Sequence, residues 1–489
     1  MRPLTRRQLL ALGAVGAGAT AAGGAGLWLT TGNGPGYTGG EDLTEPQVLA
    51  SADRVLELDL TAAPARVRVG GRDASVQAFN GSLPGPTLRV RAGDTIRVTL
   101  RNGLQAPTNL HVHGLHVSPQ GNSDNPFVSI DPGGSFDYEF TLPEDHPPGT
   151  YWYHPHRHGH AADQVAAGLY GAIVVEDPDP VPVTRDRVLV VSDLSLDAAG
   201  NLAEVDPMQQ MMGRVGEIVL VNGQLRPQLR AAPGERERWR IINACPSRYL
   251  RLALDGQQIR LLSRDLGRLP IPEDVTEVVL APGNRVELLV ETRDGSAALT
   301  AAALDRGSMN AMRGDNESGG GPVELLTLAV SGSAGTDPGP VPEGRPLRDL
   351  RNEPVAAART LNFAMGMNGN MGAGMGSGQG TMMAFTINGR EFDPERLDET
   401  AAAGTVEEWT LTNSSPMDHP IHLHVWPMQI VQDGDRDVTG PKWQDVVNVP
   451  ARRQVKVRVA FDDFAGRTVI HCHILDHEDQ GMMATVQAR

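Results

Sequence analysis

FNGSLPGPTLRVRAGDTIRVTLRN, the stretch from Phe79 to Asn102, starts with an Asn-Gly turn signal. Two short segments follow, and a Gly-containing turn separates them. Apolar and polar residues alternate in both segments, as they do in half-buried strands. The apolar positions are Leu88, Val90, Ile96, Val98 and Leu100. The stretch therefore predicts two β-strands joined by a turn.

The same pattern occurs twice more along the chain. It returns as LVNGQLRPQLRAAPGERERWRIIN from Leu220 to Asn243, and as FTINGREFDPERLDETAAAGTVEEWTLTN from Phe385 to Asn413. The three stretches start 141 and 165 residues apart, which is domain-sized and too long for a solenoid repeat. We expect three homologous all-β domains, each a Greek-key β-sandwich. Their approximate limits are 50–178, 185–335 and 355–489, with Pro-rich joints between them.

Composition agrees with this organisation and excludes several classes of protein. The chain has 489 residues, and domains of about 150 residues suggest three of them. The formal charge of −16 disfavours binding to nucleic acid or to anionic membrane surfaces. Two cysteines form at most one disulfide, so the fold is not a disulfide-stapled scaffold.

The N-terminal segment 1–35 is predicted to be an export signal. Arg6 and Arg7 precede a weakly apolar stretch from about Leu9 to Leu29, which is typical of a twin-arginine signal. The alternative is an uncleaved membrane anchor, for which the many glycines of the stretch are a poor fit. We expect the twin-arginine export machinery as a partner, a periplasmic or secreted protein, and no stable membrane insertion after processing.

Histidine is distributed unevenly. All fourteen histidines lie in the first and third predicted domains, and none falls between His160 and His419. Two domain ends also match each other, GTYWYHPHRHGH (149–160) and GRTVIHCHILDH (466–477), with Pro155 at the position of Cys472. Four tight motifs contain ten of the histidines: His111 with His113; His154 with His156; His419 with His422 and His424; and His471 with His473 and His477.

These motifs predict metal binding. On a strand, residues i and i+2 point to one face, so each His-x-His presents two imidazoles together. An isolated pair is more simply a pair of ordinary core or surface histidines, but four pairs together with His-Cys-His favour a metal centre. Two His, one Cys and a weak axial Met form a blue-copper site, which His419, Cys472, His477 and Met482 supply.

The other eight histidines form four His-x-His pairs, two from the first domain and two from the third. The simplest assembly is a multi-copper cluster between these domains. Cys472 is bonded through the chain to His471 and His473, which gives electrons a short path from the blue site to the cluster. One-electron donors would then be oxidised at one end and O₂ reduced at the other. We expect four residues to be non-ligands and Cys245 to be a buried apolar residue; the four are His116, His146, His158 and His160.

The motifs resemble the copper-binding segments of the multicopper oxidases, which include laccases, bilirubin oxidases and bacterial cuprous oxidases. The resemblance implies three cupredoxin domains, a middle domain without copper, and reduction of O₂ to water. It also implies four copper ions: one type 1, one type 2 and two type 3. By it, His111 and His422 bind type 2 copper, and the blue-site residues above bind type 1. The type 3 ligands it implies are His113, His154, His156, His424, His471 and His473.

Two carboxylates resemble the acids that deliver protons in this family. Glu478 directly follows a type 1 ligand, and Asp124 lies just past the first His-x-His. The alternative for each is an ordinary solvated carboxylate.

Methionine clusters suggest the electron donor. Soft thioethers bind Cu(I), and the Gly-rich segment before the third repeat contains several of them. This segment resembles the methionine-rich insertion of periplasmic cuprous oxidases, and Met417 matches a substrate-copper ligand there. Ser415 stands where that group has an acid, with Asp418 nearby. The candidate substrate-copper residues are Met417, Met365, Met367, Met371 and Met375; Met382, Met383 and a second group, Met208, Met211 and Met212, extend the pattern.

Cuprous ion is thus the leading predicted substrate, as part of copper detoxification. Phenols or other small organic donors are the alternative, in which the Gly-rich segment is a flexible low-complexity insertion. Two non-enzymatic alternatives are an exported cupredoxin scaffold that acts in cell-envelope assembly, and a copper store or carrier.

Overall fold

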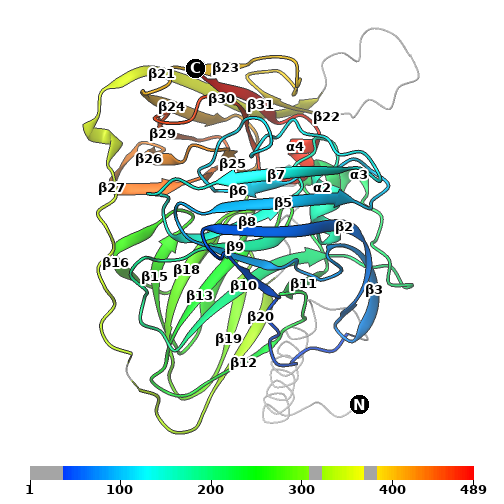
Figure 1. Cartoon of the computed structure of the whole chain (residues 1–489), viewed down its shortest axis with the longest axis vertical. Helices are drawn as coiled ribbons and strands as arrows, with labels where there is room; N and C mark the ends of the chain where they lie inside the picture. The colour runs from blue at the N-terminus through cyan, green and yellow to red at the C-terminus, as the bar shows by residue number, and fades with distance from the viewer. Residues whose placement is uncertain (1–36, 308–321, 337, 368–382) are drawn as a thin grey trace, which may run out of the picture.

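The computed structural model describes residues 37–307, 322–336, 338–367 and 383–489. Within these ranges the chain forms six β-sheets, two from each third of the chain, and each pair encloses its own hydrophobic core (Figure 1). The all-β class with three sandwich domains is therefore confirmed, whereas the domain limits stay predictions. The export signal at 1–35 lies outside the described residues.

The first sandwich pairs a five-stranded sheet with a four-stranded one. The five-stranded sheet runs in the order β1 (Val48–Ala50), β4 (Thr87–Val90), β9 (Gly171–Val175), β8 (Gly149–His154) and β6 (His111–His113). The four-stranded sheet runs in the order β3 (Arg72–Phe79), β2 (Val55–Val69), β5 (Thr95–Asn102) and β7 (Ser135–Thr141). The strand β6, which carries two predicted ligands, is thus the last strand of its sheet.

The middle sandwich pairs a six-stranded sheet with a five-stranded one. The order in the first is β11 (Ile218–Val221), β10 (Arg185–Leu194), β13 (Arg236–Asn243), β18 (Arg285–Glu291), β15 (Gln258–Arg264) and β16 (Arg268–Val275). The order in the second is β12 (Gln228–Ala231), β20 (Val323–Val330), β19 (Gly295–Ala302), β14 (Leu250–Leu254) and β17 (Val278–Leu280). Cys245 is buried in the core between them, as expected.

The third sandwich repeats this plan. One sheet has the order β22 (Met383–Ile387), β21 (Val355–Met367), β24 (Val406–Asn413), β29 (Gln454–Ala460), β26 (Met428–Asp433) and β27 (Arg436–Gln444). The other has the order β23 (Glu399–Ala401), β31 (Met483–Ala488), β30 (Gly466–Cys472), β25 (His419–Leu423) and β28 (Val446–Val449). The strands β25 and β30 are neighbours, and they carry four further predicted ligands: His419, His422, His471 and Cys472.

The repeated sequence stretch folds as its pattern predicts. In each domain its two segments are consecutive strands: β4 and β5, β12 and β13, β23 and β24. The turn asparagines Asn80, Asn222 and Asn388 all have positive φ angles, of 52°, 51° and 54°. Asparagine tolerates this left-handed conformation better than most residues, which explains why the same residue recurs at the turn.

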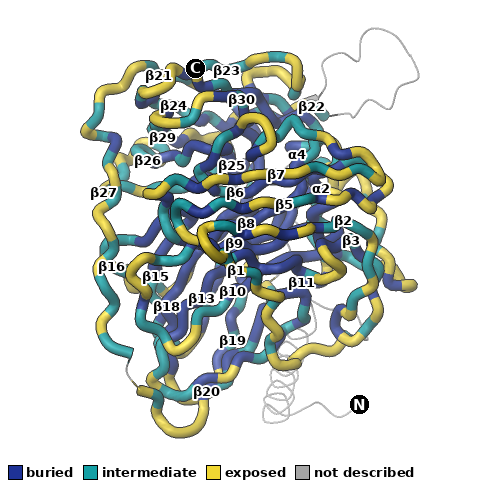
Figure 2. The backbone as a smooth tube through the Cα atoms, in the orientation of Figure 1, coloured by how far each residue is buried: buried dark blue, intermediate teal, exposed yellow. Residues whose placement is uncertain are grey.

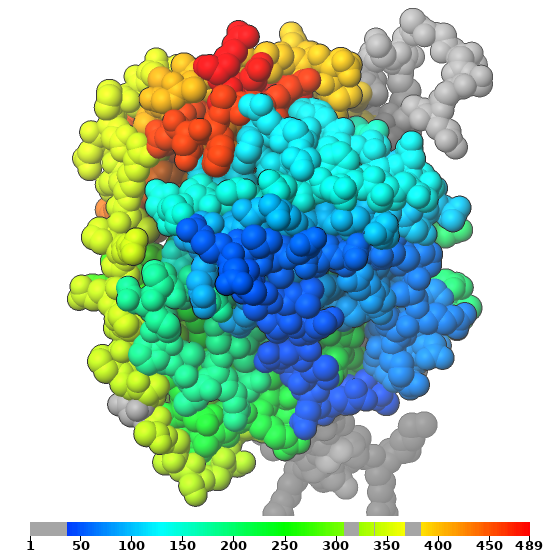
Figure 3. Space-filling model, in the orientation of Figure 1, coloured from blue at the N-terminus to red at the C-terminus, as the bar shows by residue number. Residues whose placement is uncertain are grey.

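The domains are packed so that strands of different sandwiches cover one another. In Figure 3 the third domain, coloured orange to red, lies above the first, coloured blue to cyan, and the second lies below in green. Every residue of β6, β8 and β25 is buried (Figure 2). A sandwich strand normally exposes one face, so burial of both faces shows that neighbouring domains cover the outer face.

Short helices connect the strands near this junction. No helix among the described residues is long and apolar enough to cross a membrane. The helical segments are α2 (Ala161–Ala167), α3 (Pro207–Met212), η2 (Leu350–Asn352) and α4 (Leu475–Asp479).

Candidate metal centre

Two pairs of neighbouring strands bring the predicted ligands to the junction of the first and third domains. In the first domain β6 pairs with β8, so that His111 lies opposite His154. In the third domain β25 pairs with β30, and His422 lies opposite His471. The alternation of side chains along each strand then directs both histidines of a His-x-His pair to the same face.

The His-Cys-His triplet of β30 serves two faces of its sheet. Cys472 belongs to the hydrophobic core of the third sandwich, together with Ile421 and Met482. His471 points the other way, because its Nε2 lies 3.1 Å from Nε2 of His156 in the first domain. One strand therefore supplies a ligand inside the third domain and ligands at the interface, as the two-residue period requires.

Three imidazoles converge on one point of the interface. The Nε2 atom of His156 lies 3.1 Å from that of His471 and 3.2 Å from that of His424. The Nε2 atoms of His424 and His471 are also 3.2 Å apart. Three nitrogens on such a triangle can bind a single metal ion.

The other five cluster histidines lie beside this triangle. Nε2 of His111 and Nε2 of His422 are 3.4 Å apart, and Nε2 of His154 and Nδ1 of His113 are 3.5 Å apart. The ring of His473 lies 5.0 Å from that of His113. The structure thus brings together all eight histidines of the four His-x-His pairs.

The chemistry of these groups fits metal ions. Burial, reinforced by neighbouring imidazoles, lowers the pKa of His154 to about 3 and that of His156 to about 4. The rings are therefore neutral at pH 7, the state in which imidazole binds a metal. Both ring nitrogens of His473 and Nδ1 of His424 are buried without a hydrogen-bond partner among the described residues. Buried polar atoms in native proteins are normally paired, so these nitrogens require a ligand.

Hydrogen bonds at the far side of several rings fix their orientation. Nδ1 of His111 lies 2.9 Å from Oδ1 of Asp124, and Nδ1 of His422 lies 2.8 Å from the carbonyl oxygen of Asp445. Nδ1 of His154 lies 2.9 Å from the carbonyl oxygen of Pro155. A ring that donates from one nitrogen presents the other as an acceptor, which is the arrangement common to metal-binding histidines.

A second group lies inside the third domain. Sγ of Cys472 is 3.4 Å from Nδ1 of His419 and 3.8 Å from Nδ1 of His477. Met482 is fully buried in the same core. Burial raises the pKa of the Cys472 thiol, so a thiolate here needs a cation to compensate its charge. The two imidazoles, thiol and thioether match the donor set of blue-copper sites.

All three domains hold the short helix α4, which carries His477. Asp476 accepts hydrogen bonds of 3.0 and 2.7 Å from the Nε and Nη2 atoms of Arg214 in the middle domain. Asp479 accepts hydrogen bonds from the amides of Gly159 and Ala162, at 2.7 and 2.8 Å, where α2 of the first domain begins. These contacts fix α4, and with it His477, relative to both other domains.

The middle domain also contributes residues that the sequence did not indicate. Arg285 donates two hydrogen bonds of 2.6 Å to the carboxylate of Asp445 in the third domain. Oδ1 of Asp445 lies 3.3 Å from Nε2 of His113. Both residues are buried. No local motif marks them, since they meet only when the three domains are docked.

The two predicted proton-carrying acids are buried beside the cluster. Oε2 of Glu478 lies 3.0 Å from Nδ1 of His471, and Oε1 lies 3.4 Å from Nε2 of His156. Burial raises the pKa of Asp124 to about 8, although its hydrogen bond from the amide of Val112 opposes the shift. Neither residue is therefore the solvated surface carboxylate considered as the alternative.

The predicted substrate methionines fall into two groups. Met365 and Met417 are buried in the third-domain core, where neither presents a thioether at the surface. Met367 ends β21, and Met371 and Met375 lie outside the described residues. Asp418 is engaged by hydrogen bonds from Asn448 and from the amide of Ala451, 2.9 and 2.8 Å long.

The helix α3 brings another set of methionines close to the group of His419, Cys472, His477 and Met482 (the blue-site group). Nε2 of His477 donates to the carbonyl oxygen of Met211, 3.1 Å away. Met211 and Met212 pack against the third-domain core, and Met208 on the same helix is 60% exposed.

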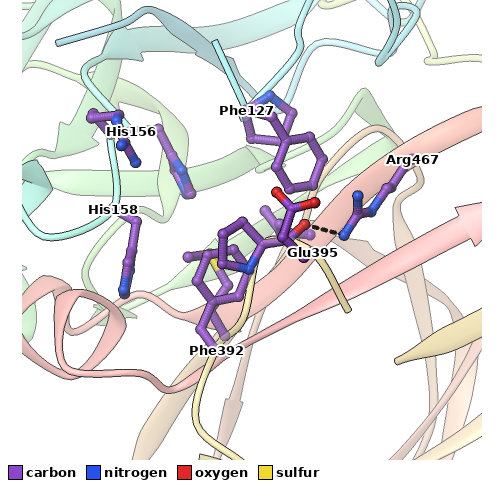
Figure 4. Close-up of a pocket in the computed structure, with 11 residues that line it drawn as sticks. Phe127, His156, His158, Phe392, Glu395 and Arg467 are labelled. Carbon is purple, nitrogen blue, oxygen red and sulfur yellow. Dashed lines mark hydrogen bonds between the residues drawn. The ribbon is translucent and has the colours of Figure 1, made fainter. Parts of the chain in front are cut away.

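A pocket of about 270 Å³ opens beside the cluster between the first and third domains (Figure 4). His156 and His158 line one side of it, and the ring of Phe392 lies 4.8 Å from that of His158. Arg467, whose guanidinium lies 4.6 Å from the ring centre of Phe127, closes the other side. The pocket reaches a predicted ligand, so a small molecule could approach the cluster here.

The four histidines expected to be non-ligands belong to none of the metal-sized groups in the described part of the chain. His116 instead spans the first and third domains: its Nε2 lies 2.9 Å from the carboxylate of Asp463, and its Nδ1 lies 2.8 Å from the carbonyl oxygen of Val425.

The fold and the donor sets together define a cupredoxin-like protein with two adjacent groups of side chains that can bind metal ions. Multicopper oxidase domain models match residues 61–180, 187–315 and 366–489. The solved structure of a Campylobacter jejuni multicopper oxidase, described as a metallo-oxidase, gives a TM-score of 0.81 at 29% identity and covers 92% of this chain and 96% of that one. The chain therefore belongs to the multicopper oxidase family.

Two curated relatives show the range of that family. The multicopper oxidase mco of Staphylococcus haemolyticus is 29% identical over 424 residues, which are 84% of this chain and 83% of the relative. The cell division protein FtsP of Edwardsiella tarda is 31% identical over 389 residues, which are 78% of each chain.

Proposed function

We propose that this protein is a four-copper oxidase that takes single electrons from a small reductant and reduces O₂ to water. His419, Cys472, His477 and Met482 would hold the type 1 copper, and His111 with His422 the type 2 copper. The type 3 pair would be held by His113, His154, His156, His424, His471 and His473. One observation carries the proposal: ten imidazoles and one thiol from two domains converge in two adjacent buried groups.

Bound copper would supply the one-electron redox chemistry. Cys472 joins the two groups covalently, because its chain neighbours His471 and His473 belong to the cluster. Reduction of O₂ to two waters consumes four electrons and four protons, so protons must enter a site with little water. Glu478 and Asp124 are placed to hold and pass them, since each carboxylate is buried and lies within 3.0 Å of a cluster imidazole.

Cuprous ion is the substrate that we favour. The backbone of α3 contacts His477, the side chains of Met211 and Met212 pack against the third-domain core, and Met208 is exposed on the same helix. Their soft thioethers suit Cu(I). The description of the Campylobacter jejuni relative as a metallo-oxidase agrees with a metal-ion donor. A phenol or another small organic donor is the second candidate.

The likeness to a cell division protein raises a non-catalytic alternative. Such a protein would need neither converging ligands nor buried acids beside them. The complete donor sets of this chain favour the oxidase. We further propose that the protein acts in the periplasm or outside the cell, and that segment 1–35 directs export by the twin-arginine route.

Copper analysis of the purified protein, combined with visible absorption and O₂ uptake, tests the proposal. We expect four coppers per chain, a blue absorption band, and O₂ uptake on addition of Cu(I). Cys472→Ser should lose the blue band and one copper. Cys245→Ser is the matched control, because it removes the other buried free cysteine and should change neither. A colourless protein without O₂ uptake would refute the proposal.

A further inference from the structure

Arg306 of the middle domain is fully buried against the blue-site group of the third domain. Its backbone carbonyl accepts a hydrogen bond of 2.7 Å from the amide of Asp418, the residue before His419. The next residue, Gly307, has a φ of 75°, and a Cβ atom there would lie 2.4 Å from the carbonyl oxygen of Pro416. This close backbone approach fixes Arg306 beside one histidine of the group.

The guanidinium is linked to the second histidine, His477, through backbone carbonyls of α3. Nη2 of Arg306 donates to the carbonyl oxygen of Met212, 2.7 Å away. The preceding carbonyl, that of Met211, accepts the hydrogen bond from Nε2 of His477. Nη1 donates to the carbonyl oxygen of Ser247 at 3.2 Å, and the guanidinium carbon lies 5.9 Å from the ring centre of Tyr249. Arg306 therefore contacts the backbone next to His419 and the helix that accepts the hydrogen bond of His477.

The side chain places a positive charge in this low-dielectric region. Burial lowers the pKa of Arg306 below its ordinary value of 12.5, but a guanidinium stays protonated in proteins. A buried charge is screened far less than one in water, so the charge of Arg306 acts on the adjacent blue-site group.

We propose that Arg306 is a positioning residue that raises the reduction potential of the type 1 copper. The inference rests on the proposed function. Reduction adds one electron and so lowers the net charge of the site by one. A fixed nearby cation favours the state of lower positive charge, which is the reduced state. Arg306 would thereby determine which donors are strong enough reductants to be oxidised.

A redox titration of the holoprotein that follows the blue absorption band tests this. Arg306→Met and Arg306→Gln remove the charge. At a fixed potential each should lower the ratio of reduced to oxidised type 1 copper about tenfold, which corresponds to about 59 mV for a one-electron couple. Arg306→Lys keeps the charge and should remain close to the unmodified protein.

Arg264→Met is the matched control. Arg264 is a half-buried arginine of the same domain whose Nη1 also donates to a backbone carbonyl, that of Val279, at 2.7 Å. Arg264→Met should leave the reduction potential of the type 1 copper unchanged. An unchanged potential in both charge-removing variants, or an equal fall in Arg306→Lys, would overturn the inference. Absence of the blue band in the unmodified protein would instead refute the proposed function.

Discussion

The carboxylate of Asp445 in the third domain is held by the guanidinium of Arg285 in the middle domain through two hydrogen bonds of 2.6 Å each. The same carboxylate lies 3.3 Å from Nε2 of His113 in the first domain. One buried ion pair therefore connects all three domains at the edge of the cluster. The middle domain, which carries no histidine, contributes to the metal centre by orienting residues of the other two.

Replacing Arg285 should damage both stability and metal binding. Arg285→Met leaves the charge of Asp445 buried without its partner, and breaking a buried pair in this way costs about 3–5 kcal/mol. We expect the free energy of unfolding to fall by about that amount. We also expect the cluster to lose its copper more readily than the blue site does. Chemical denaturation and copper analysis measure the two effects. Arg251→Gln breaks the exposed pair with Glu277 and should cost less than about 1 kcal/mol. Equal effects of the two variants would contradict a special role for Arg285.

Replacing Glu478 should slow O₂ reduction selectively. Glu478→Gln keeps the size of the side chain but removes an acid next to His471, and loss of a general acid typically lowers a rate by about 10²-fold or more. Turnover at saturating donor should therefore fall, while the blue absorption band stays intact. Glu391→Gln, a change at an exposed carboxylate of the same domain, is the control. Unchanged turnover in Glu478→Gln would remove the assigned role.

Much of this centre follows from strand periodicity, and the remainder depends on how the domains dock. The sequence alone predicted that His471 and His473 point to the same face, because side chains i and i+2 share a face of a strand. The same alternation along β21 places Met365 in the core with Leu361, although the methionine pattern predicts a substrate-copper role for Met365. Arg285 and Arg306 could not be found in this way. Each acts on residues of another domain that are more than a hundred positions away in the chain.

The Gly-rich segment between β21 and β22 should decide which donor is oxidised. Met367 pairs with Met383 at the end of this hairpin where the connecting segment begins, so residues 368–382 can be replaced by a two-residue turn without disturbing the strands. If the segment collects Cu(I) and covers the site, the deletion should lower Cu(I) oxidation several-fold and raise phenol oxidation. Steady-state kinetics with both donors measure this. Replacing Met371, Met375 and Met382 by Leu keeps the length of the segment and should lower only the Cu(I) rate. Unaltered Cu(I) kinetics in both variants would exclude the segment from substrate delivery.

The contact between His116 and Asp463 should make the junction of the first and third domains sensitive to pH. Burial alone would lower the pKa of His116, but hydrogen bonds to Asp463 and to the carbonyl of Val425 raise it overall above 6.5. A pKa raised by folding stabilises the folded state below the unfolded value, and this stabilisation is lost as the pH rises through the folded value. Asp463→Asn should therefore lower the midpoint of thermal unfolding at about pH 5 and have little effect at about pH 9, where His116 is neutral. Asp462→Asn, one residue away and paired with Arg348 instead, should show no such pH dependence, because a guanidinium stays protonated throughout this range. Equal destabilisation by Asp463→Asn at both pH values would mean that the charge on His116 does not hold the domains together.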